Sequence, residues 1–190
     1  GTLPLVMHAM NPQAQYAGKK YIVYSIGGAA FAFIAMVFMM YYGTSLDFTF
    51  GGVLDMLQVA GHEQWLLVVF VLAFFGFGVK AAVFPLSGWL PSAGVAPTPV
   101  TALLHAVAVV NAGVYALVRL IYYTFGTEFL SGSWAQYVVM SAALVTIVYG
   151  SSMALRTPHL KRRLAYSTVS NLYHEARSLT VSLPEGLIEL

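Results

Sequence analysis

The sequence predicts an all-α, polytopic bundle of transmembrane helices in which one helix is broken. Three observations lead to this fold class. Hydrophobic residues make up 59% of the 190 residues and charged residues only 8%, about a third of the charged share of a soluble domain. Uncharged segments recur at the length of about 20 residues that crosses a bilayer as a helix. Basic and acidic side chains are also separated into alternating loops, as in multi-pass membrane proteins.

The composition excludes several classes of protein. So few charges cannot cover the surface of a soluble globule of this size, and the apolar content excludes intrinsic disorder. The net charge of +2 is too small, and the basic residues too scattered, for a nucleic-acid surface. Because the chain has no cysteine, disulfides, iron–sulfur clusters and thiolate zinc sites are excluded as well.

Four spans and the start of a fifth are predicted within one transmembrane domain, residues 1–172. The expected helices cover residues 21–42, 65–84 continuing as a broken helix to 90, 98–123 and 134–155, with another helix starting at 164. Residues 173–190 are more polar and lose this periodicity, so they form an atypical C-terminal tail without an assigned function. We expect the chain to be an internal piece of a larger membrane protein.

The break in the second span follows from its prolines. Lys80 is the one charged side chain between Gln64 and Val118, and this apolar stretch would be about 80 Å long as a single helix. Prolines interrupt it at Pro85, Pro91, Pro97 and Pro99, where they remove backbone donors and disfavour helix in the preceding residue. Irregular backbone at membrane depth is tolerated where it is buried in protein or lines an aqueous cavity.

The loops predict the orientation in the membrane. Lysine and arginine gather in loops 17–20 and 156–163, whereas the other side carries Asp47, Asp55, Glu63 and Glu128. Because basic loops mark the cytoplasmic face, we expect loops 17–20 and 156–163 in the cytoplasm of a cell (inner) membrane protein.

Lys80 is the first candidate for chemistry. It lies about 22 Å along its span if the helix begins near Trp65, well inside a hydrocarbon core about 30 Å thick. An ionisable residue at that depth is costly and indicates function by default. A lysine that alternates between a dry site and a carboxylate partner can release and recapture a proton. The alternative is a lysine that snorkels to the cytoplasmic interface.

His105 is the second candidate. Helical geometry places Thr98, Thr101, His105 and Arg119 in one polar stripe on an otherwise apolar helix. Histidine can pass protons at cellular pH, although a structural histidine remains the alternative. The histidines show neither an i, i+4 pair nor a carboxylate at ligand spacing, so no metal site is expected.

Two long signatures resemble a known family. They are Lys80-Ala-Ala-Val-Phe-Pro-Leu-Ser-Gly-Trp-Leu-Pro-Ser-Ala followed by Ala96-Pro-Thr-Pro-Val-Thr-Ala-Leu-Leu-His105-Ala, and Leu160-Lys-Arg-Arg-Leu-Ala-Tyr-Ser-Thr-Val-Ser-Asn-Leu172. The chain resembles the antiporter-like, proton-translocating membrane subunits of respiratory complex I, membrane-bound hydrogenases and Mrp-type cation/proton antiporters. The resemblance covers about residues 3–172 and implies part of an inverted-repeat transporter fold.

The resemblance implies a role for each matching residue. Lys80 matches the family's central lysine on a helix broken in mid-membrane, and His105 matches the relay histidine on the next helix. The glutamate that partners this lysine is expected upstream of Pro4, outside the chain. Ser87, Thr98 and Thr101 would support the polar path, and Lys161 and Arg162 belong to the cytoplasmic loop. There are two departures from the family: Ser87 stands where many members have histidine or glutamine, and Ser92 stands where an aspartate is usual.

The expected function is that of a proton-translocating component of a redox-driven pump, similar to those of NADH:quinone oxidoreductase or membrane-bound hydrogenase. It would catalyse no redox step itself and would bind no cofactor, since flavin, iron–sulfur clusters and quinone would belong to partner subunits. Its partners would be other membrane subunits, the bilayer, and protons, with sodium ions as a second candidate. The alternatives are a module of an Mrp-type cation/proton antiporter and a non-conducting structural subunit.

Overall fold

A computed structural model describes residues 3–8, 11–45, 47, 52–94, 96–102 and 109–181. These residues are mostly helical and include no β-strand. The prediction of an all-α chain is therefore confirmed, and the individual helices can be compared with the expected spans.

The described helices follow one another along the chain. In order they are α1 (Leu3–Val6), α2 (Pro12–Tyr42), α3 (Met56–Val59), α4 (Glu63–Gly78), the 3-10 helix η1 (Leu86–Gly88), α5 (Trp89–Ala93), α6 (Thr98–Ala102), α7 (Val109–Arg119), the π-helix η3 (Leu120–Phe125), α8 (Thr127–Leu130), α9 (Trp134–Arg156) and α10 (Leu160–Val181).

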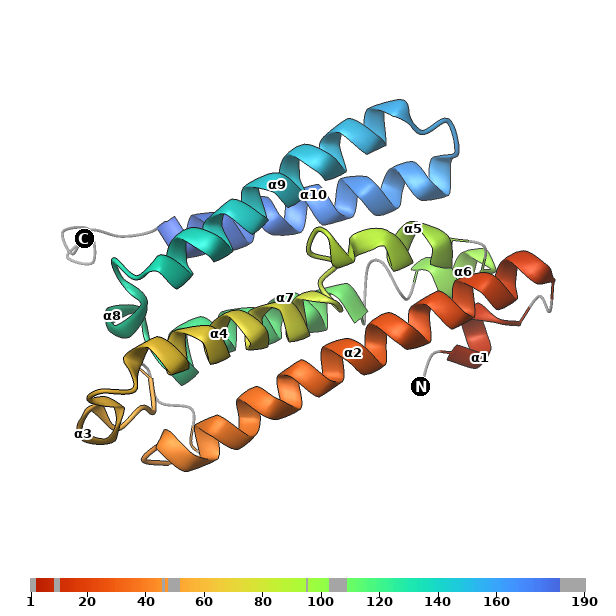
Figure 1. Cartoon of the computed structure of the whole chain (residues 1–190). Helices are drawn as coiled ribbons and strands as arrows, with labels where there is room; N and C mark the ends of the chain where they lie inside the picture. Colours follow the sequence, from red (N-terminus) through yellow and green to blue (C-terminus); the bar gives the residue numbers. More distant parts are fainter. Residues whose placement is uncertain are drawn as a thin grey trace.

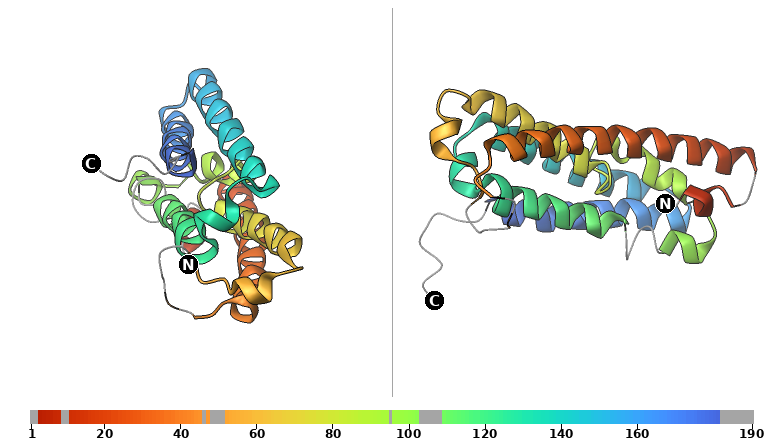
Figure 2. Two further views of the ribbon diagram at one scale, coloured as in Figure 1. Left: turned by 90° about the vertical axis from the view of Figure 1, so that its left-hand side faces the viewer. Right: turned by 90° about the horizontal axis from the view of Figure 1, so that it is seen from below.

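The long helices run back and forth along a common direction, as Figures 1 and 2 show. Helix α4 packs against α2, α7 and α9, and α10 packs most extensively against α9. The start of α2, α5, α6 and the α9–α10 turn lie at one end of the bundle, on the right in Figure 1. The end of α2, together with α3 and α8, lies at the opposite end.

Helix α2 is a single uninterrupted helix of 31 residues. It begins at Pro12 rather than at Tyr21, because Asn11 provides a cap: the Asn11 side-chain Oδ1 accepts the Ala14 N–H at 2.7 Å. Proline at the first helical position is compatible with helix, since its missing N–H would have no partner there. The apolar span predicted from hydropathy is thus the inner part of a longer helix.

Two glycines allow α2 and α4 to cross closely. A Cβ added to Gly28 would lie 2.7 Å from the Gly76 carbonyl oxygen, and one added to Gly76 would lie 2.8 Å from Ala32 N. Small residues at such crossings let helix backbones approach one another, as is common inside membranes. Gly76 therefore makes room for α2, the neighbouring helix.

Helices α9 and α10 form an antiparallel hairpin. Ser133 caps α9 by accepting the Gln136 N–H, and the hydroxyls of Ser151 and Ser170 are hydrogen-bonded at 2.7 Å. The sequence assigns residues from 173 onward to an atypical tail, whereas α10 continues to Val181. Helix α9 of this hairpin contacts the irregular segment between α4 and α5 at Phe84.

By length and apolar composition, two of the described helices could each cross a membrane: Pro12–Tyr42 and Trp134–Arg156. Two further apolar helices, Glu63–Gly78 and Val109–Phe125, are shorter. Half of the α4 residues are buried, including Phe70 and Phe74. Large apolar side chains of α2, such as Val23 and Phe33, remain exposed at 69% and 61%.

Candidate functional site

Lys80 lies just beyond the end of α4. The helix ends at Gly78, Val79 follows as its cap, and the Lys80 N–H donates to the Phe77 carbonyl at 3.0 Å. Its side chain is exposed on the surface of the described chain, whereas its neighbours Ala81 and Ala82 are fully buried. The lysine side chain therefore projects from a buried turn to the surface of the described chain.

The turn after Lys80 is tight and irregular. The Ala82 N–H donates to the Val79 carbonyl at 3.2 Å, and the Val83 N–H donates to the Gly78 carbonyl at 2.9 Å. Ala82 has a φ of 58°, a left-handed conformation that is unfavourable for a residue with a Cβ. The Phe84–Pro85 peptide bond is cis. Helical structure resumes at Leu86, so the chain between Gly78 and Leu86 is not helical.

Neighbouring elements hold this turn by direct contacts. The Trp89 indole N–H donates to the Val79 carbonyl at 2.7 Å, and the Phe84 N–H donates to the Thr146 hydroxyl of α9 at 3.0 Å. A Cβ added to Gly113 of α7 would lie 2.5 Å from Ala81 N, so the backbone of the turn touches α7. The first two contacts give the Val79 carbonyl a second donor beside the Ala82 N–H and give the Phe84 N–H an acceptor outside the turn.

The remaining prolines and serines of the break lie beside the turn. Pro85 precedes η1, Ser87 is buried within it, and Pro91 is buried within α5. The Ser92 hydroxyl donates to the Gly88 carbonyl at 3.0 Å. The Lys20 amine of α2 reaches this segment, because a Cβ added to Gly88 would lie 3.2 Å from it.

Thr101 and Lys161 meet at one carbonyl group. The Ala96 carbonyl accepts the Thr101 hydroxyl at 3.0 Å and the Lys161 amine at 3.4 Å. Thr101 is buried, whereas Thr98, Pro97 and Pro99 are exposed at the start of α6. Arg162 is exposed next to Lys161 on α10. The structure thus brings two of the predicted residues together and joins α10 to the segment that precedes α6.

His105 lies outside the described residues, so its relation to Lys80 remains a prediction. Beyond it on the same predicted span, the Arg119 guanidinium lies over the Tyr115 ring, 4.8 Å from the ring centroid. Among the described residues, no group of three or more His, Asp or Glu could hold a metal ion.

Most of the charged residues divide between the two ends of the bundle; Lys80 at the break and Arg119 at the end of α7 are exceptions. Lys19 and Lys20 lie in the first turns of α2, and Arg156, Lys161 and Arg162 flank the α9–α10 turn at the same end. Asp55, Glu63 and Glu128 lie at the other end, in or next to α3, α4 and α8. The separation of charge seen along the sequence is therefore also a separation in space.

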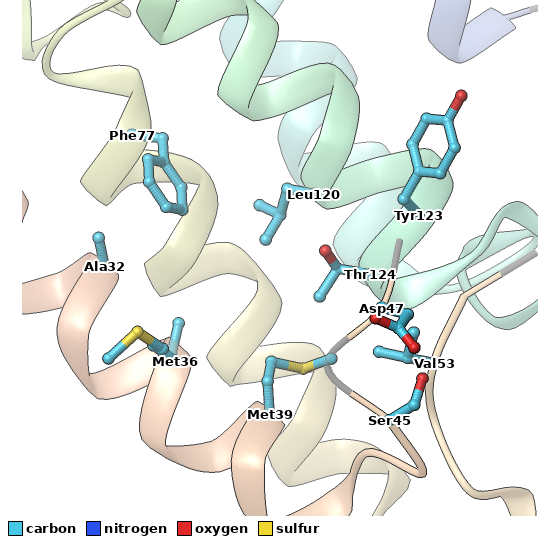
Figure 3. A pocket seen from close by; sticks show the side chains of 11 residues that line it. Ala32, Met36, Met39, Ser45, Asp47, Val53, Phe77, Leu120, Tyr123 and Thr124 are labelled. Carbon is cyan, nitrogen blue, oxygen red and sulfur yellow. The ribbon is translucent and has the colours of Figure 1, made fainter. Parts of the chain in front are cut away.

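A cavity of about 250 Å³ lies between α2, α4 and η3 (Figure 3). Its walls include Met36, Phe77 and Leu120, and Ser45 and Asp47 gather with Val53 at one end. Lys80 does not line this cavity, which is therefore distinct from the site around the break.

Comparison with known proteins places this arrangement in a family. The model of the NADH:quinone oxidoreductase/Mrp antiporter transmembrane family matches residues 1–174. The chain belongs to this family. The match ends close to position 172, where the sequence signatures end, and the resemblance stated from those signatures is confirmed.

Curated relatives come from two kinds of membrane complex within this family. The chain is 35% identical to NAD(P)H-quinone oxidoreductase chain 4 2 of Thermosynechococcus vestitus, a match that covers 84% of the chain and 29% of that protein. It is 32% identical to a Na(+)/H(+) antiporter subunit of Alkalihalophilus pseudofirmus, covering 84% of the chain and 19% of that protein. The chain therefore spans less than a third of either relative.

Solved structures of family members share the fold. The membrane-bound sulfane sulfur reductase, an archaeal respiratory membrane complex, matches with a TM-score of 0.75 at 30% identity over 97% of the chain and 37% of the matching chain. The Mrp complex from Dietzia sp. gives a TM-score of 0.75 at 28% identity over 96% of the chain and 19% of the matching chain. Both neighbours are multi-subunit membrane complexes, so a membrane location and an antiporter-like fold follow for this chain.

Sequence reasoning did not find three residues that shape the site: Trp89, Gly113 and Thr146. Trp89 stood within the family signature without an assigned role, and Gly113 is one small residue among many. Thr146 had a detectable signal, because a hydroxyl in the middle of an apolar span often makes a hydrogen bond to another helix.

Proposed function

We propose that this chain is part of a proton-translocating membrane subunit of a redox-driven complex, with Lys80 as the residue that stores and releases the proton. The observation that carries the proposal is the position of Lys80. It is the one charged residue in the apolar sequence from Gln64 to Val118, and it follows directly on the end of α4. An ionisable side chain at membrane depth is a mark of an ion or proton path.

In this proposal α4 and α5 are two halves of one broken transmembrane helix. Predicted span 65–84 would include α4, predicted span 98–123 would include α6, α7 and η3, and the four crossings would form part of an inverted repeat. The expected loop 17–20 is part of helix α2; residues 17–20 and 156–163 would nevertheless face the cytoplasm, since lysine and arginine gather at that end. A carboxylate from a segment upstream of Pro4 would pair with Lys80 and cover its exposed face.

Proton transfer would proceed from Lys80 towards His105. Lysine can act in this way because its ammonium group loses a proton when its carboxylate partner withdraws, which arginine cannot do. Imidazole is suited to the next step, since histidine exchanges protons near neutral pH. Ser87, Thr98 and Thr101 would supply hydroxyls along the path, while electrons, flavin, iron–sulfur clusters and quinone would belong to partner subunits.

The proposal is tested in the full-length subunit within its native complex. We expect Lys80→Ala and Lys80→Arg to assemble but to abolish proton uptake into membrane vesicles, followed with a pH-sensitive dye. Lys19→Ala is the matched control, because Lys19 is an exposed lysine on α2 outside the break, and it should leave uptake unchanged. Normal uptake by Lys80→Ala would instead indicate a structural subunit.

The second candidate is a module of an Mrp-type cation/proton antiporter. The specific observation in its favour is that the Mrp complex from Dietzia sp. matches with the same TM-score, 0.75, as the respiratory complex. The two candidates are separated by the driving force in the vesicle assay. Uptake that needs an electron donor supports the redox-driven pump, whereas exchange driven by a sodium gradient alone supports the antiporter.

A further inference from the structure

We propose that Thr146 of α9 is a positioning residue for Lys80. It would hold the chain where α4 has ended, so that Lys80 projects from a fixed point. The inference rests on the proposed role of Lys80 and adds a residue from a different helix to the same site.

The Phe84 N–H at the break has an unusual hydrogen-bond acceptor. In a continuous helix the Phe84 N–H would donate to the carbonyl of Lys80, four residues earlier. Here it donates to the Thr146 hydroxyl at 3.0 Å, across 62 positions of sequence. Thr146 thus takes the place of the Lys80 carbonyl as the acceptor for Phe84.

The Thr146 hydroxyl is oriented for this task by its own helix. It is completely buried and donates its hydrogen to the Ala142 carbonyl at 2.6 Å. Since a hydroxyl has one hydrogen and two lone pairs, this bond leaves the oxygen as an acceptor for Phe84. The side chain is therefore set as an acceptor before the break packs against it.

The same helix also contacts the side chain of Phe84. The rings of Phe84 and Tyr149 lie 5.0 Å apart between centroids at an angle of 48°. Tyr149 is three residues after Thr146, so the two residues share one face of α9. Helix α9 therefore holds Phe84 both by its backbone and by its ring.

The chain at Val79 and the backbone of Lys80 are also fixed by contacts with other elements. Trp89 donates to the Val79 carbonyl at 2.7 Å, and a Cβ added to Gly113 would lie 2.9 Å from the Lys80 carbonyl carbon. Lys80 thus lies between two anchored points, Val79 and Phe84. A shift of about 1 Å at a reacting group can reduce a rate about a hundredfold, so the anchors matter for a residue that must meet a proton donor and an acceptor.

Removing the acceptor should disturb the break locally. Thr146→Val keeps the branched shape and volume of the side chain but leaves the Phe84 N–H without its partner. A backbone donor without a partner is unfavourable in a membrane interior, so residues 80–84 would rearrange to find one. The bulk of α9 would be unaffected, because the surrounding packing surface is retained.

The experiment compares three variants in the full-length subunit within its native complex: Thr146→Val, Thr146→Ser and Ser151→Ala. Serine retains the hydroxyl. Ser151→Ala is the matched control, because it removes a hydroxyl of the same helix whose partner is Ser170 of α10 rather than the break. Each variant is measured for the amount of assembled complex, the proton-uptake rate per complex, and the pH dependence of that rate.

We expect Thr146→Val to assemble and to lose about tenfold or more in proton-uptake rate per complex. The midpoint of its pH profile should also shift, because this midpoint reports the ionisable groups that are essential for transport. Thr146→Ser should restore the rate and the midpoint, and Ser151→Ala should match the parent. An unchanged rate per complex and pH profile in Thr146→Val would overturn the inference while leaving Lys80 as proposed. If Lys80→Ala itself transports normally, the proposed function fails instead.

Discussion

Helix α2 and the segment from α4 to α5 are both strongly apolar, yet one is continuous and the other is interrupted. Helix α2 contains Gly18, Gly27 and Gly28 and still runs for 31 residues. Helix α4 ends at Gly78, and helical structure resumes only at Leu86. Glycine therefore does not by itself stop a helix in this chain, and another cause must act after Gly78.

Proline accounts for the later part of the interruption, beyond Ala81. The ring of a proline clashes with the carbonyl four residues earlier and disfavours helix in the residue just before it. For Pro85 these positions are Ala81 and Phe84, the region in which the chain departs from helix. In α2 the proline is Pro12 at the first helical position, where no clash arises. The interrupted segment then depends on side chains from other helices, and the continuous one does not.

The largest effect is expected at the contact between α7 and the break. Gly113→Ala would bring a Cβ to 2.5 Å from Ala81 N, and since the neighbour is backbone, the variant should lose about 3 kcal/mol of stability. Gly27→Ala is the matched control in α2, because nothing lies within 4 Å of its added Cβ. The midpoint of thermal unfolding of the full-length subunit in detergent measures both, and equal midpoints would contradict the close approach.

The second effect concerns the two tryptophans that donate hydrogen bonds. Trp89→Phe removes the indole bond to the Val79 carbonyl, which keeps only the Ala82 N–H at 3.2 Å, and should cost about 1.5 kcal/mol. Trp134→Phe, where Trp134 is 40% exposed and donates to Gln64 at 3.1 Å, should cost less than about 0.5 kcal/mol. The same thermal midpoints test this difference. A Trp134→Phe loss as large as that of Trp89→Phe would show that the break does not depend on its indole.

A third effect tests the beginning of α2. Asn11→Ala removes the cap that accepts the Ala14 N–H and should cost about 1 kcal/mol. Asn11→Asp keeps a capping oxygen and should restore the stability. Helix content by circular dichroism, followed through thermal unfolding, measures the loss, and a fully stable Asn11→Ala would show that the helix does not begin at Pro12.

The smallest effect compares the backbone conformation at Ala82, in the interrupted segment, with that at Ala35, in α2. Ala82→Gly should be neutral within about 0.5 kcal/mol, because relief of the left-handed conformation offsets the greater freedom of glycine when unfolded. Ala35→Gly, at a buried position inside α2, should cost about 1 kcal/mol. Thermal midpoints again give the comparison, and equal losses at the two positions would indicate an ordinary helical φ at Ala82.

Much of the fold can be predicted because hydropathy and proline act locally. The prolines predict an interruption between Phe84 and Val100, and the structure ends α4 at Gly78, earlier than the predicted boundary at residue 84. The span predicted from hydropathy does not reach the start of α2, because four of the residues from Pro12 to Lys20 are glutamine or lysine, although Asn11-Pro12 is a readable start signal.

The contacts that shape the site could not be predicted in the same way. The partner of Phe84 is 62 positions away at Thr146, and the neighbour of the Lys80 backbone is a glycine on α7. Hydropathy and periodicity report which face of a helix is apolar, but not which residue of one helix meets which residue of another. Lys80 could be identified from the sequence alone, because a single charged residue in an apolar segment is recognisable without knowledge of its contacts.

The length of α2 has a consequence for the choice of lipid. Its 31 residues extend about 46 Å, whereas the apolar part from Tyr21 to Tyr42 extends about 33 Å and matches a hydrocarbon layer about 30 Å thick. In the proposed orientation, the remaining turns, with Lys19 and Lys20, would extend into the headgroup layer. A change of bilayer thickness would then create a hydrophobic mismatch that α2 would relieve by tilting. The Gly28–Gly76 crossing would transmit that tilt to α4. The length of the lipid acyl chains would thereby affect the position of the turn that carries Lys80.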